Sequence, residues 1–206
     1  MKLEAREVTF RYPGKRKHPI LQGVSLSIAP GERVGLRAPS GSGKTTICRL
    51  LAGYEKPQQG EILLDGRPLR DYRGVCPVQM VWQHPETVVD PLLRLGDTLA
   101  EAGAVEERLM QALHIEKAWM NRYPAELSGG ELQRFCIARA LHPQTRFLLC
   151  DEISAMLDLV TQAQIWRLLL EEAARRQLGL LVVSHDSALL RQVCTRVESL
   201  SGLGRT

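Results

Sequence analysis

The sequence predicts an α/β fold with a mostly parallel sheet, an antiparallel β portion near the N-terminus and an inserted helical segment. Short apolar runs typical of buried strands alternate with helical patterns over most of the 206 residues, and strands joined by crossover helices form parallel sheets. The segment 84–127 differs, because apolar residues recur there at helical spacing, around Leu92–Ala102 and Val105–Leu113. We therefore expect a single domain, 1–206, made of a core at about 1–83 and 128–206 and a helical subdomain at about 84–127.

The first third of the chain is expected to form strands separated by turns. Residues 3–12 and 24–28 alternate apolar and polar side chains, as a strand with one buried face does. Pro30-Gly31 and Asp65-Gly66 are typical turn pairs. The expected elements are strands at 3–12, 24–28, 33–38 and 61–64, and a helix at 45–52.

The last third alternates amphipathic helices with strands that are apolar throughout, which is the pattern of strands buried on both faces. The expected elements are helices at 131–141, 161–177 and 187–194, and strands at 147–150 and 180–183.

Composition and charge are ordinary for a globular protein, with 44% hydrophobic and 24% charged residues. The net charge of +4 is too small to indicate a nucleic acid or an anionic membrane as partner. No apolar run approaches the roughly 20 residues of a membrane-spanning helix, and the N-terminal stretch alternates like a strand rather than showing a signal-peptide core. The five cysteines form no CxxC pair, so neither a disulfide framework nor a metal cluster is expected.

A glycine-rich loop lies between the strand expected at 33–38 and the helix that follows. Its sequence, Ala38-Pro-Ser-Gly-Ser-Gly-Lys-Thr45, matches a phosphate-binding loop except at Ala38, where the consensus has glycine. Glycines let backbone N–H groups turn toward a polyphosphate at the positive end of the helix, whereas a methyl at Ala38 restricts the backbone if a positive φ is required there. Lys44 can reach the outer phosphates and Thr45 can ligate Mg²⁺. The residues expected to bind nucleotide here are Pro39, Ser40, Gly41, Ser42, Gly43, Lys44, Thr45 and Thr46.

Polar residues at the ends of other apolar runs are candidates for the same site, because parallel strands bring their carboxyl ends to one edge of a sheet. Asp151 and Glu152 follow the strand expected at 147–150; we assign Asp151 to Mg²⁺ and Glu152 to the base that orients the attacking water. His185 ends the strand at 180–183 and is placed to contact the γ-phosphate. Gln83 ends the short run Met80-Val-Trp-Gln83, and its amide is placed to reach Mg²⁺ and the water.

A second anion site is expected at Leu127-Ser-Gly-Gly-Glu-Leu-Gln-Arg134. Ser128 is a natural helix N-cap, and Gly129-Gly130 expose backbone N–H groups at the start of a helix. Because the chain already has a phosphate loop for its own nucleotide, this second site is expected to serve a nucleotide bound to another subunit.

These motifs, in this order, resemble the nucleotide-binding subunits of ABC transporters over nearly the whole chain. The closest likeness is to the peptide/nickel import group. Three segments carry it, and they resemble that group's VQMVFQDP, RYPHELSGG and DVSVQAQI: Val78-Gln-Met-Val-Trp-Gln-His-Pro, Arg122-Tyr-Pro-Ala-Glu-Leu-Ser-Gly-Gly and Asp158-Leu-Val-Thr-Gln-Ala-Gln-Ile.

The resemblance implies that Tyr12 stacks on adenine, that Asp158, in the dimer-contact loop, is among the nucleotide-binding residues, and that ATP and Mg²⁺ are used. Two ATPase subunits, alike or different, would meet head to tail, each ATP lying between one subunit's phosphate loop and the other's signature. The partners implied are transmembrane permease subunits and, indirectly, a solute-binding protein, with this chain peripheral on the cytoplasmic face of the membrane. The cargo implied is peptides, nickel or metal–chelator complexes.

Two departures and two alternatives accompany this interpretation. Ile153 stands where many members have proline or alanine, and Met156 replaces a small residue of the dimer-contact loop.

One alternative is an ABC ATPase acting on nucleic acid or ribosomes. DNA-repair members insert a long coiled coil, for which the 43 residues between Gln83 and Leu127 leave no room. Ribosomal members carry two ATPase modules in one chain. The other is an accessory ATPase of the carbon–phosphorus-lyase type, which resembles the same group. We expect no nucleic-acid partner.

Overall fold

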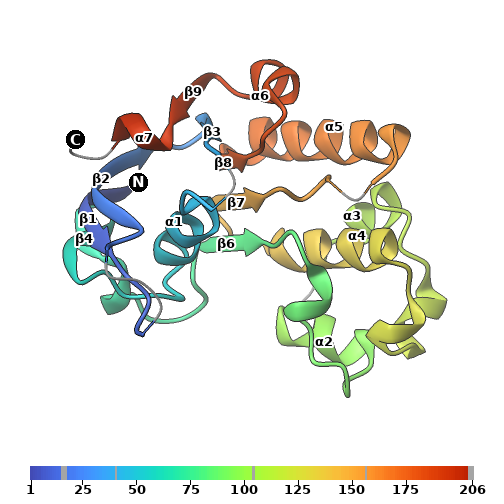
Figure 1. The fold of residues 1–206 in the computed structure, drawn as a ribbon. Coiled ribbons are helices and arrows are strands. Elements are labelled where there is room, and N and C mark those ends of the chain that lie inside the picture. The colour runs from blue at the N-terminus through green and yellow to red at the C-terminus, as the bar shows by residue number, and fades with distance from the viewer. Residues whose placement is uncertain (15–17, 40, 104, 156, 204–206) are drawn as a thin grey trace.

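The structure is a computed structural model that describes residues 1–14, 18–39, 41–103, 105–155 and 157–203. Figure 1 shows antiparallel strands at one side, parallel strands at the centre and most of the helices beyond them. The strands are β1 Leu3–Phe10, β2 Leu21–Ile28, β3 Arg33–Arg37, β4 Gln59–Leu64, β5 Arg67–Pro68, β6 Val78–Val81, β7 Phe147–Asp151, β8 Gly179–Val183 and β9 Arg196–Ser199. The α-helices are α1 Lys44–Leu51, α2 Leu95–Glu101, α3 Glu107–Ala112, α4 Gly129–Ala140, α5 Leu159–Arg176, α6 Ser187–Val193 and α7 Leu200–Leu203.

The strands form two sheets, as the α/β prediction requires. The first is antiparallel, in the order β2-β1-β4-β5, and the second has the order β6-β7-β8-β3-β9, with every described pair parallel. The carboxyl ends of β6, β7, β8 and β3 therefore share one edge, which is where sites of open parallel sheets are built. The predicted fold class is confirmed.

The parallel strands divide the apolar core into two clusters because their side chains alternate between faces. Phe147 and Leu149 of β7 face the cluster that includes α1 and the antiparallel sheet. Leu148 and Cys150 face the cluster that includes α4, α5 and α6. A sheet covered on both faces explains why its central strands are continuous apolar runs.

The segment 84–127 contains α2 and α3 together with short 3₁₀ turns, η2 Pro85–Thr87, η3 Lys117–Asn121 and η4 Pro124–Glu126. It is joined to the core by α4, and Figure 1 shows these helices grouped away from the antiparallel sheet. Its α-helices are shorter than the apolar spacing predicted, since α2 covers seven residues and α3 six. Within the described residues, no helix is both long enough and apolar enough to span a membrane.

Candidate functional site

The phosphate loop has the geometry that its glycines require. Gly41 and Gly43 have φ of 76° and 102°, which side-chain-bearing residues rarely adopt. A Cβ at Gly43 would lie 2.9 Å from the side chain of Leu21, whereas one at Gly41 would meet nothing within 4 Å. Gly43 is thus needed both for its backbone angle and for space. Ser40, which the sequence assigned to this loop, lies outside the described residues.

Ala38 does not distort the loop. The described non-glycine residues with positive φ do not include it, and its methyl is buried, with 7% exposure. The restriction expected for a left-handed alanine therefore does not arise.

Lys44 lies across the mouth of the loop. Its Nζ donates to the carbonyl oxygens of Ala38 at 2.8 Å and Pro39 at 3.4 Å. It also lies 3.4 Å from Oε1 of Glu152. A buried ammonium beside a helix N-terminus concentrates positive charge where the glycine loop is open.

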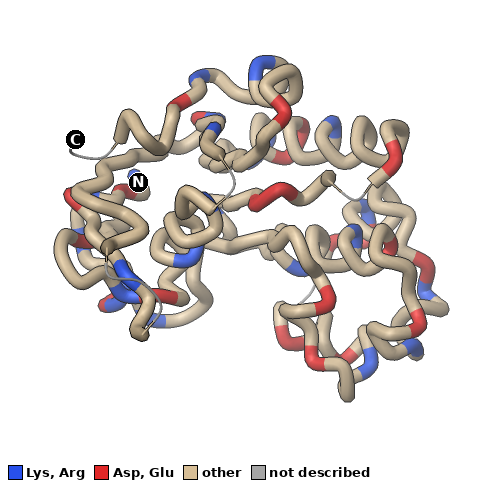
Figure 2. Tube along the Cα trace, in the orientation of Figure 1, with Lys and Arg blue, Asp and Glu red and all other residues tan. Residues whose placement is uncertain are grey.

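Two acids, Asp151 and Glu152, lie at the carboxyl end of β7, where the tube of Figure 2 is red, and their environments differ. Asp151 is 2% exposed, and burial raises the pKa of its carboxyl, while a hydrogen bond from the Thr45 side chain acts in the opposite direction. Glu152 has a φ of 51°, and its N–H donates to the carbonyl of Val183 at 3.0 Å. A left-handed glutamate is a strained conformation that clusters at functional sites, and here it turns the side chain of Glu152 away from the strand.

His185 meets Glu152 at the end of β8. Its Nδ1 lies 3.2 Å from Oε2 of Glu152, and the His185 side chain is 73% exposed while that of Glu152 is 16% exposed. A pocket of about 180 Å³ adjoins them, lined by Ser184, Ala155 and Gln162 among others. The arrangement offers a carboxylate and an imidazole, both able to accept hydrogen bonds, beside a space large enough for water.

Gln83 and Tyr12 border this centre without contacting the acids directly. Gln83 follows β6, which pairs with β7 through Val81 and Cys150. Gln83 and Glu152 therefore both lie at the sheet edge formed by the carboxyl ends of the parallel strands. Tyr12 packs edge-to-face on Phe10, with ring centroids 4.8 Å apart. Its hydroxyl is 3.4 Å from the hydroxyl of Thr46, which places the ring beside the first turn of α1.

The signature forms a capped and open helix N-terminus. The Ser128 hydroxyl accepts from the N–H of Glu131 at 3.3 Å, and the Glu131 carboxylate accepts from the N–H of Ser128 at 2.7 Å. Hydrogen bonds from the Ser128 side chain and backbone lower the pKa of Glu131. A Cβ at Gly129 would meet nothing within 4 Å, whereas one at Gly130 would lie 3.3 Å from the side chain of Leu157, so there is open space beside Gly129. The capping role of Glu131 was not among the predicted features, although a glutamate three residues after a serine signals it.

The signature and the phosphate loop are separate places on the chain. Helix α4 has 12 residues and extends about 18 Å at 1.5 Å per residue; Figure 1 shows it running outward from the sheet. Its N-terminus therefore lies away from α1, and the two anion-binding helix ends do not face a common nucleotide within one chain.

Asp158 caps α5, because its Oδ1 accepts from the N–H groups of Val160 and Thr161, both at 3.0 Å. Hydrogen bonds from the side chain and backbone of Thr161 lower its pKa. Met156, the departure in the same loop, lies outside the described residues.

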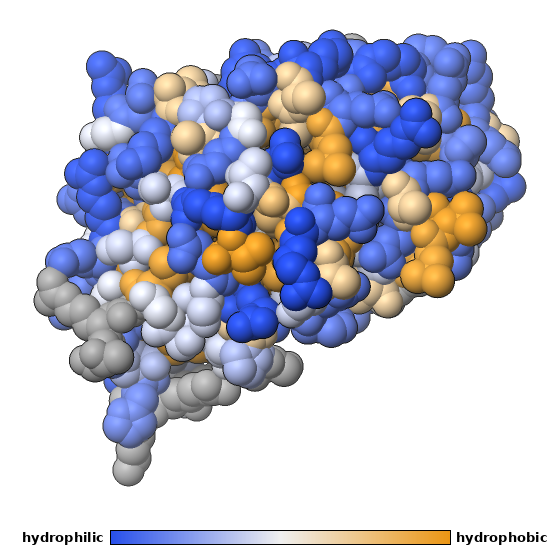
Figure 3. Space-filling model, turned by 90° about the horizontal axis from the view of Figure 1, so that it is seen from above, coloured by the Kyte–Doolittle hydropathy of each residue, from blue (hydrophilic) through white to orange (hydrophobic). Residues whose placement is uncertain are grey.

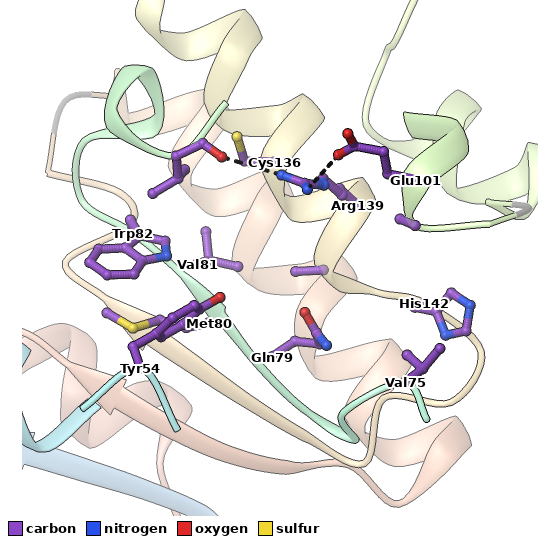
Figure 4. Close-up of a pocket in the computed structure, with 13 residues that line it drawn as sticks. Tyr54, Val75, Gln79, Met80, Val81, Trp82, Glu101, Cys136, Arg139 and His142 are labelled. Carbon is purple, nitrogen blue, oxygen red and sulfur yellow. Dashed lines mark hydrogen bonds and ion pairs between the residues drawn. The ribbon is translucent and has the colours of Figure 1, made fainter. Parts of the chain in front are cut away.

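A second pocket, a groove of about 470 Å³, lies beside β6, whose residues form part of its wall. Figure 4 shows its lining. Tyr54 and Trp82 line it from the core, while Glu101 and Arg139 line it from α2 and α4. Arg139 pairs with Glu101 at 3.1 Å. Burial raises the pKa of the Cys136 thiol in the groove wall to about 12, so this cysteine is an unreactive apolar surface at neutral pH.

A strand, glycine loop and helix, with an acid pair at the carboxyl end of another parallel strand of the same sheet, define a phosphate-loop nucleotide hydrolase. The family model described as ABC transporter matches residues 21–155, and the chain belongs to this family. It is an ATP-binding subunit that hydrolyses ATP, and its likeness to the peptide/nickel import group agrees with the relatives that it matches.

Three known proteins illustrate the similarity. The nickel import ATP-binding protein NikE of Rhodospirillum rubrum is 38% identical, over 86% of this chain and 71% of that protein. The methionine import ATP-binding protein MetN of Caulobacter vibrioides is 38% identical, over 89% of this chain and 59% of that protein. The dimeric structure of a post-hydrolysis ATP-binding cassette bound to ADP and Pi is 25% identical, with a TM-score of 0.81, over 96% of this chain and 93% of that one.

Proposed function

We propose that this chain is the ATPase subunit of an ABC importer and that it works as one of a pair. The observation that carries the proposal is the separation, within one chain, of two anion-binding helix ends: the phosphate loop before α1 and the signature at α4. A single nucleotide cannot use both ends of one subunit. Each ATP would therefore lie between the phosphate loop of one subunit and Ser128, Gly129 and Gly130 of the other.

In this proposal the phosphate loop supplies backbone N–H groups and Lys44 to the phosphates, and Tyr12 stacks on adenine. Thr45, Gln83 and Asp151 offer hard oxygen donors suited to Mg²⁺, and the Thr45–Asp151 hydrogen bond shows that two of these side chains already meet. When bound there with the nucleotide, Mg²⁺ would neutralise phosphate charge.

Glu152 is proposed as the base that orients the attacking water, and His185 as the group that holds Glu152 and contacts the γ-phosphate. Lys44 and His185 contact the two carboxylate oxygens of Glu152, one each. In this proposal Lys44 binds the phosphates, and the carboxylate oxygen beside it is available to the water. Asp158 is proposed to act in the contact with the second subunit while it caps α5.

The proposed partners beyond the second ATPase subunit are transmembrane permease subunits and, through them, a solute-binding protein. The groove beside Trp82 supports a permease contact, because core and helical-segment residues line it together and Gln83 is adjacent. A permease element bound in this groove would be displaced by any relative movement of the core and the helical segment. The chain would then be peripheral on the cytoplasmic face of the membrane.

For cargo we propose the peptide/nickel class, meaning peptides, nickel or metal–chelator complexes, on the likeness to NikE and the three sequence segments quoted above. MetN, at the same identity, makes methionine the competing cargo. Deleting the gene and measuring cellular uptake of labelled nickel, a dipeptide and methionine would separate them. Loss of methionine uptake alone would overturn the proposed class.

The substitution Glu152→Gln tests the catalytic proposal. It should lower kcat at least about 100-fold, because a positioned base contributes that much or more, while ATP binding persists, because Lys44 and the glycine loop remain. The measurements are steady-state phosphate release and equilibrium binding of a fluorescent ATP analogue. Glu171→Gln, an exposed acid on α5, is the matched control and should leave both unchanged. Near-normal turnover of Glu152→Gln would refute the assignment.

A further inference from the structure

Gln133 is a buried side chain of the signature helix that makes no contact with either proposed nucleotide site. It is 4% exposed and lies five residues after Ser128. Its Nε2 donates to the backbone carbonyl of Trp82 at 3.0 Å, across a sequence separation of 51 residues. This bond connects α4 to the segment that carries Gln83, the residue next to Trp82.

Trp82 is in turn held by the helix of the phosphate loop. The guanidinium of Arg49, on α1, lies 4.8 Å from the centre of the Trp82 ring, a distance at which a cation and an aromatic face attract. The ring of Tyr54, just beyond α1, packs against Trp82 at 5.4 Å, and Figure 4 shows these two rings side by side. Trp82 is thus fixed by its ring to α1 and by its carbonyl to α4.

Packing alone does not account for a glutamine at this position. Its Oε1 is buried and has no hydrogen-bond partner among the described residues, and such an unpaired acceptor is unfavourable. An apolar side chain of equal length would fill the same space without that penalty. The amide donor is therefore the distinctive property of Gln133.

We propose that Gln133 is a positioning residue that couples the two half-sites of one subunit. Through the Trp82 carbonyl it ties α4 to Gln83, so that nucleotide bound at this chain's own phosphate loop repositions the N-terminus of α4, where the second subunit's nucleotide is bound. The inference rests on the proposed function. Its physical basis is that a hydrogen-bonded α-helix transmits displacement along its length, and Ser128 lies little more than one turn from Gln133.

The test is Gln133→Met, which keeps the length of the side chain and removes the donor. We expect a thermal unfolding midpoint within a few degrees of the unsubstituted chain, ATP affinity within about twofold and KM little changed, but kcat reduced roughly tenfold or more, since small misplacements of catalytic geometry have effects of this size. Gln111→Met, the same change at an exposed position of α3, is the matched control and should leave kcat unaltered. A kcat equal to that of the unsubstituted chain would overturn the proposal.

Hydrogen exchange gives a second readout that does not depend on how Gln133→Met folds. In a Ser128→Arg chain, whose phosphate loop is intact but whose signature is designed not to hold a partner's nucleotide, ATP should slow exchange both at 81–84 and in the first turns of α4. Slowing at 81–84 alone would overturn the coupling. Failure of the proposed function is distinguishable, because the unsubstituted chain would then hydrolyse ATP without pairing, whereas failure of this inference leaves hydrolysis by the paired subunits intact.

Discussion

At residue 38 the chain has alanine where phosphate loops commonly have glycine, and the structure explains why this is tolerated. Ala38 is not among the described residues with positive φ, and its carbonyl, not its side chain, meets Lys44. We predict that Ala38→Gly leaves ATP affinity within about twofold and lowers the free energy of unfolding by roughly 0.4–1 kcal/mol, because glycine adds freedom to the unfolded chain. Urea unfolding and nucleotide titration measure the two quantities.

Gly43→Ala is the natural comparison for Ala38→Gly. Its φ of 102° and the 2.9 Å approach of Leu21 make a methyl unfavourable there, so this variant should lose both stability and ATP binding. If Ala38→Gly instead strengthened ATP binding tenfold, the Ala38 methyl would be shown to obstruct the phosphates.

Some site residues were predictable one by one and others were not. Lys44, Asp151 and His185 each stand at a strand end or directly after a glycine loop, so parallel topology alone predicts that they converge. Gln133 gave no such signal, because its partner is a backbone carbonyl 51 residues away and a helical glutamine is ordinarily exposed. The left-handed backbone of Glu152 could not be predicted either. It accompanies a hydrogen bond from the Glu152 N–H to β8, and the residue type gives no sign of it.

Among the elements, the central apolar strands β7 and β8 were predicted, whereas β5, β6 and β9 were not among the expected strands. The buried runs at β7 and β8 match the predicted strands within a residue or two. Strand β9 was missed, because Arg196-Val-Glu-Ser is only partly buried; it is an edge strand beside β3, held by an ion pair of Arg196 with Glu32 at 2.6 Å. Edge strands often carry charged side chains, which discourage pairing with further strands. In β9 these side chains replace the apolar residues by which a strand is predicted from sequence.

Helices α3 and α5 are joined by a group of ion pairs around one buried carboxylate. Glu172 is 1% exposed and lies 2.7 Å from Arg108 and 2.9 Å from Arg175, while Glu106 contacts both arginines. Burial alone would raise the pKa of Glu172, but hydrogen bonds from Arg175 and Arg108 lower it below its ordinary value of 4.5. This group anchors the helical segment to the core.

We predict that Glu172→Gln lowers the free energy of unfolding by about 1–2 kcal/mol at neutral pH, because a buried neutral amide cannot replace the charge-assisted hydrogen bonds that the carboxylate accepts from Arg108 and Arg175, while these two half-exposed arginines stay hydrated. A lowered folded-state pKa means that the ionised group stabilises the fold above its ordinary pKa and that this contribution is lost as pH falls through the folded-state value. The difference between the two proteins should therefore shrink below about pH 4.5. Urea unfolding across that range measures it.

Glu171→Gln provides the control for that prediction. Glu171 is the preceding residue of α5, and its pair with Arg167 is exposed on both sides, so its loss should cost at most about 0.5 kcal/mol. Equal destabilisation by the two substitutions would contradict the anchoring role of Glu172.

At the scale of the whole molecule, two apolar clusters share one parallel sheet, and each carries a different half of the proposed chemistry. The phosphate loop and α1 belong to the cluster on one face; α4 with its signature belongs to the other. The surface seen from above is mainly hydrophilic with scattered apolar groups (Figure 3). Two of the most exposed apolar residues, Leu159 and Val160, at 82% and 68%, begin α5, directly after Asp158, which is proposed to act in the contact with the second subunit.

The separation of the two helix ends leads to a prediction for Ser128→Arg. An arginine at the N-terminus of α4 would block a partner's phosphate and should reduce ATP hydrolysis at least about 100-fold, the effect of losing a preorganised donor. ATP affinity of the single subunit should survive, because the phosphate loop lies elsewhere. Ser128→Ala separates the lost helix cap, worth about 1 kcal/mol of stability, from the blocked anion site. Equal loss of single-subunit ATP binding in Ser128→Arg would contradict a signature that acts on a partner's nucleotide.

A mixture of Ser128→Arg chains and Lys44→Ala chains gives a more specific test of whether each ATP site is shared between subunits. Each variant alone should be inactive, because every paired site would lack either the signature or the phosphate-loop lysine. In a mixed pair of identical chains, however, one of the two sites combines the intact phosphate loop of the first variant with the intact signature of the second. Phosphate release should therefore reappear on mixing, in proportion to the mixed pairs formed, if the chain pairs with its own copy. Mixed samples that stay inactive, while the unsubstituted chain alone hydrolyses ATP as a dimer, would refute a site shared between subunits.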